Sequence, residues 1–303
     1  MNVPASIEIT EVGPRDGLQN QRVVITSDTK IAFVDSLSKT GLQRIEVSSF
    51  VNPKWVPQLA DAADVLSGIC RSENVKYTAL VPNERGWDRA MEVGVDEIAL
   101  MTAASETFCK RNTNTTIAGS IDRIKPLVEY ANANGVGIRG YVSCVVACPY
   151  EGEIDSELVR RVVEQLLDIG VEDISLGETI GVAVPSDIAR LYDALDGVLS
   201  PEQSVLHLHD TRGTALACAF FAMQLGVRRF DTSSGGLGGC PYAPGAEGNL
   251  ATEDLVYFAN RMGIDTGVNL DRLISAAQII EKSLDSPLGG RVYKASSCQE
   301  PSS

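Results

Sequence analysis

Residues 204–225 read SVLHLHDTRGTALACAFFAMQL, and this stretch contains the pattern that decides the fold of the chain. Its first part, Ser204–Leu208, is a short and mainly apolar run that predicts a buried β-strand. Its last part, Thr214–Leu225, predicts a helix, and the polar residues between the two predict a loop. The stretch is therefore one strand–loop–helix unit.

The same unit occurs eight times along the 303 residues. The predicted strands cover residues 6–11, 44–47, 75–81, 97–101, 137–142, 173–176, 204–208 and 228–231. The predicted helices cover residues 27–39, 56–67, 83–93, 121–134, 155–169, 185–195, 214–225 and 252–262, and a further helix covers 269–282. Eight such units in order favour a closed (β/α)8 TIM barrel of the α/β class over an open doubly wound sheet.

The barrel prediction sets the domain organisation. We expect a single domain over residues 1–303, with the barrel at roughly 5–262 and a C-terminal helical segment at roughly 263–303. This extra segment offers a surface through which two copies of the chain could form a homodimer.

The composition limits the classes of partner. The chain has 40 acidic and 26 basic residues, giving a net charge of -14, which disfavours binding to nucleic acid or to an anionic membrane surface. No apolar run reaches the ~18 residues of a membrane helix. The seven cysteines are scattered and form no CxxC pair, and no secretory signal precedes the first strand, so we expect a cytoplasmic protein.

The chain contains only two histidines, His207 and His209, at the end of the seventh predicted strand. Residues i and i+2 of a strand project to the same face, so both imidazoles point into the barrel mouth, where TIM barrels carry their chemistry. Neutral imidazole is a common ligand of divalent metals. Two hydrogen-bonded core histidines are the alternative, but the pairing at strand spacing favours a metal site.

Two oxygen ligands are candidates to complete this site. Asp16 follows the first strand within EVGPRDGLQN (11–20), and Asn249 follows the glycine-rich loop after the eighth strand. Two imidazoles with carboxylate and amide oxygens suit Mg²⁺ or Mn²⁺ better than structural zinc, while catalytic zinc or cobalt stays open. The alternative for Asp16 is a turn residue before Gly17.

Three charged residues near strand ends are candidates for catalysis. Arg15 precedes Asp16, and a guanidinium at a barrel mouth can hold an oxyanion or a carboxylate. Glu46 lies within an apolar strand and Glu178 follows the sixth strand, so either acid can orient a histidine or Arg15, and Glu178 can also accept a proton. A surface arginine and an outer ion pair are the corresponding structural alternatives.

The loop over residues 233–249 reads SSGGLGGCPYAPGAEGN and contains six glycines. Glycine permits positive φ and close backbone approach, and such loops serve as mobile lids. A thiol on a closing loop, here Cys240, can act as a general acid or base. Spacing alone favours the alternative, that Cys240 is an inert small residue.

These motifs together resemble the 3-hydroxy-3-methylglutaryl-CoA lyase family over nearly the whole chain. The resemblance is carried by EVGPRDGLQNQ (11–21), IEVSSFVNPKWVPQLAD (45–61), RGYVSCVVACPYEGE (139–153), SLGETIG (175–181), HLHDTRGTALA (207–217) and GGLGGCPYAPGAEGNLATEDLVY (235–257). The combination of Arg-Asp after strand 1, HxHD after strand 7 and GGLGGCP after strand 8 is far more specific than any one of them.

The resemblance implies a TIM-barrel metallolyase that cleaves 3-hydroxy-3-methylglutaryl-CoA to acetyl-CoA and acetoacetate, as used in leucine degradation and ketone-body metabolism. It implies that Mg²⁺ or Mn²⁺ is bound by Asp16, His207, His209 and Asn249. Arg15 would stabilise the enolate of acetyl-CoA, and Cys240 would help proton transfer. The site would also be lined by Glu46, Tyr141 and Glu178, with His207 or Glu178 as the base that removes the hydroxyl proton.

One position departs from the family pattern. Glu178 stands where the family usually has Asp, and the extra methylene moves the carboxylate by about 1.5 Å, enough to change substrate preference. The alternative substrates are a longer 3-hydroxyglutaryl-CoA or a citramalyl-type ester. A barrel that binds an acyl-CoA without cleaving it is a further alternative, which the intact Arg15, Asp16, histidines and Cys240 disfavour.

Overall fold

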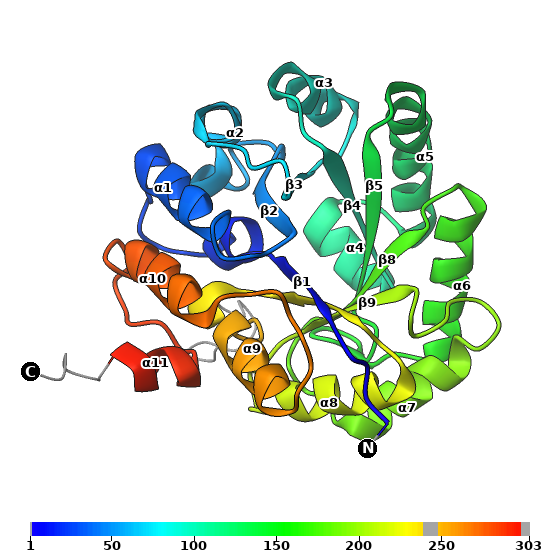
Figure 1. The fold of residues 1–303 in the computed structure, drawn as a ribbon. Helices are drawn as coiled ribbons and strands as arrows, with labels where there is room; N and C mark the ends of the chain where they lie inside the picture. Colours follow the sequence, from blue (N-terminus) through cyan, green and yellow to red (C-terminus); the bar gives the residue numbers. More distant parts are fainter. Residues whose placement is uncertain (1, 239–247, 298–303) are drawn as a thin grey trace, which may run out of the picture.

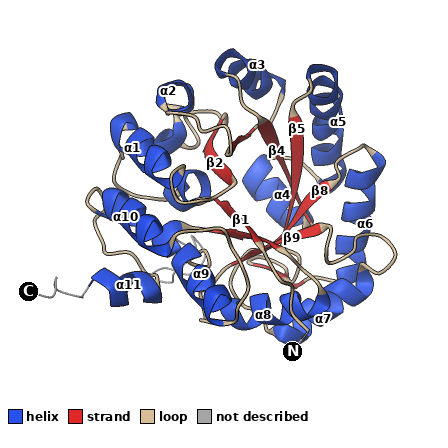
Figure 2. Cartoon of the chain, viewed as in Figure 1, coloured by secondary structure: helices blue, strands red, loops and turns tan. Residues whose placement is uncertain are grey.

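Eight parallel strands close into a barrel, and the helices surround it (Figures 1 and 2). The computed structural model describes residues 2–238 and 248–297, so Cys240 lies outside the described residues. The strand order around the barrel is β1-β10-β9-β8-β5-β4-β3-β2. The predicted TIM barrel is therefore confirmed.

Each predicted strand has a counterpart in the barrel. These strands are β1 (Glu8–Glu11), β2 (Arg44–Ser49), β3 (Lys76–Leu80), β4 (Glu97–Ala103), β5 (Gly137–Ser143), β8 (Asp173–Glu178), β9 (Ser204–Leu208) and β10 (Arg229–Thr232). The prediction worked because each strand is a short run whose outward side chains are mostly apolar and buried against the helices.

The surrounding helices also follow the predicted order. They are α1 (Ser27–Leu37), α2 (Ala62–Gly68), α3 (Glu84–Val93), α5 (Ile117–Asn134), α6 (Ser156–Asp168), α7 (Pro185–Ala194), α8 (Ala215–Leu225) and α9 (Thr252–Arg261). Several begin at a residue whose side chain accepts a hydrogen bond from a backbone N–H of the first turn, as Thr26, Asn83 and Thr116 do. The predicted helix over 56–67 is split into a 3-10 turn, Pro57–Leu59, followed by α2.

Three elements were not predicted. Helix α4 (Glu106–Thr113) is mainly polar, and the hairpin of β6 (Ala147–Cys148) and β7 (Gly152–Glu153) has only two residues in each strand. Neither gives a periodic apolar signal. Helix α11 (Arg291–Ser297) lies within the expected C-terminal helical segment of roughly 263–303, although no separate helix was predicted at these residues.

The C-terminal segment packs against the barrel at two places. Helix α10 (Leu270–Glu281) packs against α1, and the two lie side by side in Figure 1. Beyond it, Arg291 donates to Oδ2 of Asp210 at 2.6 Å, so α11 is attached to the loop that follows β9. None of the helices described is both long and apolar enough to cross a membrane.

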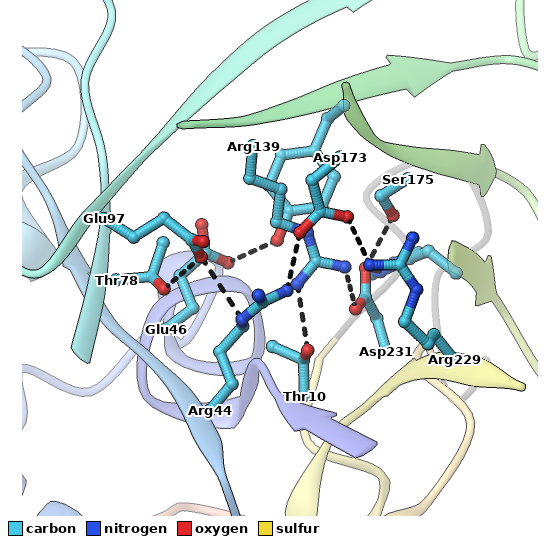
Figure 3. Close-up of polar contacts among 12 residues, drawn as sticks. Thr10, Arg44, Glu46, Thr78, Glu97, Arg139, Asp173, Ser175, Arg229 and Asp231 are labelled. Carbon is cyan, nitrogen blue, oxygen red and sulfur yellow. Dashed lines mark hydrogen bonds and ion pairs between the residues drawn. The ribbon is translucent and has the colours of Figure 1, made fainter. Parts of the chain in front are cut away.

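The barrel interior is unusually polar below the mouth. TIM barrels commonly fill this space with branched apolar side chains. Here Arg139 pairs with Asp231 at 2.5 Å, and Asp173 pairs with Arg44 at 2.8 Å and with Arg229 at 3.0 Å (Figure 3). Alternation along each strand explains the pattern, because the apolar residues face the helices and these polar residues face inward. The mouth thus rests on a layer of ion pairs.

Candidate active site

Asp16, His207 and His209 meet at the barrel mouth. One potential ligand atom from each lies within 4.8 Å of those of the other two. The histidines come from the end of β9, and Asp16 comes from a π-helical turn, η1 (Gly13–Gly17), that directly follows β1. The structure therefore brings together the three residues that the sequence spacing assigned to a metal.

Asn249 completes the group. Its Nδ2 donates to Oδ2 of Asp16 at 2.8 Å and to the carbonyl of Leu237 at 3.0 Å. Its Oδ1 is buried and has no hydrogen-bond partner in the described part of the chain. A buried orphan oxygen beside a carboxylate and two imidazoles fits a divalent cation, because buried polar atoms otherwise find a partner. Gly238 permits this packing, since its φ is +129° and a Cβ there would lie 2.6 Å from Nδ2 of Asn249.

The electrostatics hold two of these groups in their metal-binding forms. Burial by itself raises the pKa of Asp16, but Arg15 and the two imidazoles outweigh it and lower that pKa to about 2. Burial, with the neighbouring His207, lowers the pKa of His209 to about 4. At neutral pH the carboxylate is therefore ionised and His209 is neutral, which are the protonation states that bind metal.

Arg15 is fixed by three neighbours. Its Nε donates to Oε2 of Glu46 at 2.7 Å, and its Nη1 donates to Oδ1 of Asp16 at 2.7 Å. Tyr141 lies with its ring centroid 5.4 Å from the guanidinium carbon and donates its hydroxyl to the same oxygen of Glu46 at 3.2 Å. Of the two acids expected to contact a histidine or Arg15, Glu46 is the one that contacts Arg15.

A cavity of about 840 Å³ opens over these residues. Its polar floor is formed by Arg15, Asp16, Tyr141, His207, His209 and Asn249. Leu80, Met101 and Phe108 supply apolar wall on one side, and Trp55 stands 67% exposed at its edge. This volume is within the range of small-molecule sites.

Glu178 is placed differently from the expectation that it lines the site. The cavity is lined by its neighbours Gly177 and Thr179, while the Glu178 carboxylate is buried and accepts a hydrogen bond from the backbone N–H of Val182 at 3.1 Å. The reason is strand alternation: β8 continues to Glu178, so this side chain falls on the outward face. Burial raises the pKa of this carboxyl.

Three acids near the site were not singled out in the sequence. Asp231 lies below His207, with Oδ2 3.5 Å from Nδ1 of the imidazole. Glu11 accepts hydrogen bonds from Gly13 and Ser234, and Glu253 accepts one from the N–H of Gly235 at 2.6 Å. Strand periodicity places Asp231 on the inner face, so that signal was available, whereas nothing local marks the contacts of Glu11 or Glu253.

Known proteins resemble this chain over nearly its whole length. A model of the HMGL-like family matches residues 6–280. A hydroxymethylglutaryl-CoA lyase of Bacillus subtilis is 46% identical over 98% of this chain and 100% of its own length. A 3-hydroxy-3-isohexenylglutaryl-CoA/hydroxy-methylglutaryl-CoA lyase of Pseudomonas aeruginosa is 46% identical over 97% of this chain and 98% of its own.

Solved structures agree with these matches. The crystal structure of the Bacillus subtilis HMG-CoA lyase superposes with a TM-score of 0.96, covering 98% of this chain and 100% of that one. An HMG-CoA lyase of Acinetobacter baumannii, solved with coenzyme A and 3-methylmalate, is 38% identical and superposes with a TM-score of 0.92 over 98% of both chains. The likeness thus covers the whole barrel and the C-terminal segment.

Proposed function

This chain belongs to the HMGL-like family, and from that premise we propose that it is a divalent-metal-dependent lyase that cleaves 3-hydroxy-3-methylglutaryl-CoA to acetyl-CoA and acetoacetate. The observation that carries the proposal is the meeting of Asp16, His207 and His209 beside the clamped Arg15 in one cavity. Relatives that share nearly half of the residues over nearly the full length bear lyase names.

The reaction breaks the bond between C2 and C3 of the acyl group. The C3 hydroxyl loses its proton and becomes the ketone of acetoacetate, while the bonding electrons move to the thioester and form the enolate of acetyl-CoA. A proton then returns to C2. Asp16, His207, His209 and Asn249 would hold Mg²⁺ or Mn²⁺, which would supply Lewis-acid chemistry to the reaction.

Arg15 stabilises the enolate oxygen. Its ion pairs with Glu46 and Asp16 outweigh burial and raise its pKa, so the guanidinium stays charged. A fixed donor aimed at a developing oxyanion lowers the activation barrier by about 3–4 kcal/mol. Glu46 and Tyr141 act on the reaction by holding this guanidinium in place.

Two proton transfers accompany the cleavage. Of the two expected acceptors of the hydroxyl proton, His207 lines the cavity and Glu178 does not. An imidazole nitrogen that binds the metal cannot also accept this proton, so the cavity lining assigns the role of base to neither residue. The donor to C2 is the thiol of Cys240, a role that rests on the family motif and on the sequence. Replacing Cys240 with Ser should lower turnover strongly while Mn²⁺ affinity stays unchanged.

A second candidate substrate is a 3-hydroxyglutaryl-CoA with a longer alkyl group at C3. The apolar wall of Leu80, Met101 and Phe108 favours it, and the Pseudomonas aeruginosa relative carries the name of such an activity. The ratio of kcat/KM for the two acyl-CoA esters decides between them.

The five described cysteines are all free, which supports a cytoplasmic location.

The test is turnover of 3-hydroxy-3-methylglutaryl-CoA by the purified full chain, with Mg²⁺ or Mn²⁺ and with a chelator. We expect acetyl-CoA and acetoacetate in equal amounts, and loss of both with the chelator. Absence of both products with stoichiometric Mn²⁺ bound would contradict this substrate. If the longer ester and a citramalyl-type ester were then also left uncleaved, a barrel that binds an acyl-CoA without cleaving it would replace the lyase proposal.

A further inference from the structure

Asp231 lies beside His207 on the neighbouring strand. The parallel register of β9 and β10 pairs the two residues directly. Oδ2 of Asp231 lies 3.5 Å from Nδ1 of His207, which is longer than a well-formed hydrogen bond. This Nδ1 is buried and has no hydrogen-bond partner in residues 2–238 and 248–297. Asp231 is therefore the acceptor that this nitrogen faces.

The Asp231 carboxylate is itself held on both oxygens. Oδ1 accepts from Nη2 of Arg139 at 2.5 Å, and Oδ2 accepts from the hydroxyl of Ser175 at 2.7 Å. Figure 3 shows Arg139 between Thr10 and Asp231, with Ser175 on the other side of the carboxylate. Arg139 is fully buried, donates to Thr10 at 2.9 Å and lies with its guanidinium carbon 5.3 Å from the ring centroid of Tyr141. The carboxylate is thus a fixed, ionised acceptor below the mouth.

We propose that Asp231 is a positioning residue that accepts the Nδ1–H of His207, selects that tautomer, and presents Nε2 to Asp16 and His209 at the metal site. A metal-binding histidine commonly donates its second N–H to a carboxylate, which fixes the ring and raises the basicity of the ligand nitrogen. Neither Glu46 nor Glu178 takes this role here, because their carboxylates contact Arg15 and the loop backbone. The inference rests on the proposed function only in treating the site as a metal site.

A purely structural role makes a different prediction. In that case Asp231 would serve only to neutralise buried Arg139, and the state of His207 would not depend on it. Three variants separate the two roles. They are Asp231→Asn, the double variant Arg139→Met with Asp231→Leu, and Asp173→Asn as a matched control that changes an acid to its amide in the same polar layer away from His207.

The single variant reverses the hydrogen-bond polarity at His207. Arg139 needs an acceptor, so the new amide turns its oxygen toward Arg139 and its NH₂ toward the imidazole. An NH₂ group favours an unprotonated Nδ1 and moves the proton to Nε2, where it blocks metal binding. Because Arg139 also loses its ionic partner, this variant can unfold. The double variant removes that buried charge, and its leucine side chain can neither accept from Nδ1 of His207 nor donate to it.

The first measurement is the tautomer of each imidazole in the metal-free protein. The chain has two histidines, so a long-range ¹H–¹⁵N spectrum at about pH 9, where the imidazoles are neutral, contains two ring systems. We expect one wild-type ring with its proton on Nδ1, and the loss of that signature in both Asp231 variants but not in Asp173→Asn. Retention of the wild-type pattern in the Asp231 variants would overturn the proposal.

The second measurement is Mn²⁺ affinity by calorimetry on the same proteins. We expect a 10- to 100-fold higher Kd in both Asp231 variants and less than about threefold change in Asp173→Asn. Wild-type affinity in the folded double variant would show that Asp231 serves only Arg139. Neither measurement uses an acyl-CoA, so failure of the proposed lyase activity would leave the two outcomes unaffected.

Discussion

Arg15 donates to Glu46 at the mouth of the barrel, with 2.7 Å between Nε and Oε2, and both side chains are almost completely buried. The two residues come from different elements, η1 after β1 and the middle of β2. Because the same oxygen of Glu46 also accepts from the hydroxyl of Tyr141, one carboxylate sets the direction of the guanidinium and of the phenol beside it.

Replacing Glu46 with Gln should lower kcat about 10- to 100-fold, since an amide of the same shape makes a weaker, uncharged contact with Arg15. Mn²⁺ affinity should change by less than about threefold, because Glu46 is not in the metal group. Steady-state kinetics at saturating Mn²⁺ and calorimetry give the two values. An unchanged kcat would show that Asp16 alone suffices to orient Arg15.

Replacing Asp16 with Asn should weaken Mn²⁺ binding by more than about 100-fold, because the site loses its only carboxylate among the four expected ligands. The matched control is Asp210→Asn. Asp210 directly follows His209, yet its carboxylate accepts from Arg291 and from the N–H of Ala215. Calorimetry should therefore show near wild-type affinity for the control, and equal losses in both variants would refute the ligand assignment.

Shortening Glu178 to Asp tests the consequence of its outward position. If the carboxylate lay in the cavity, a change of one methylene would alter kcat/KM strongly. Because it contacts the N–H of Val182 instead, we expect turnover of 3-hydroxy-3-methylglutaryl-CoA to change by less than about threefold, or under ~0.7 kcal/mol in the barrier. The main effect of the variant should be on stability, measured as a lower midpoint of urea unfolding. A large rise in kcat/KM would instead indicate that the carboxylate at position 178 lies in the active site.

The barrel and the metal group could be predicted because their signals are local. Because alternate residues of a strand point to the same face, the sequence placed His207 and His209 together. The barrel topology brought the loop after β1 to the same mouth. The position of Glu178 was harder, because the sixth strand was predicted to end at Leu176. With β8 extended by two residues, position 178 moves from a loop at the mouth to the outer face of the sheet.

The pairing of Asp231 with His207 could not be predicted from the sequence. The predicted eighth strand already contained Asp231, and its inward direction followed from alternation. What could not be known was the stagger of β10 against β9, which pairs Asp231 with His207 rather than with Val205 or His209. Register is set by closure of the whole barrel and not by either strand alone.

Glu253 gives the stability of the fold a dependence on pH. It is completely buried at the start of α9, and its Oε1 has no hydrogen-bond partner in the described chain. Burial, reinforced by the nearby Glu11 and Asp254, raises its pKa to about 8 from the ordinary 4.5. The folded protein therefore keeps this proton at pH values where the unfolded chain has released it.

The sign of the effect follows from proton linkage. Below pH 4.5 both states carry the proton, and the contribution of Glu253 to stability is fully present. Between pH 4.5 and about 8 the unfolded chain ionises and the folded protein does not, so the free energy of unfolding falls by up to ~1.4 kcal/mol per pH unit. Glu11, whose pKa burial raises to about 6, adds a change of the same sign.

Replacing Glu253 with Gln should remove this part of the pH dependence. The amide oxygen can still accept from the N–H of Gly235, and no proton is released as the pH rises. Urea unfolding at about pH 5.5 and pH 8 should show a smaller loss of stability for this variant than for the wild type, while Glu92→Gln, an exposed acid on α3, should follow the wild type. Parallel curves for Glu253→Gln and the wild type would mean that Glu253 is already ionised in the folded barrel.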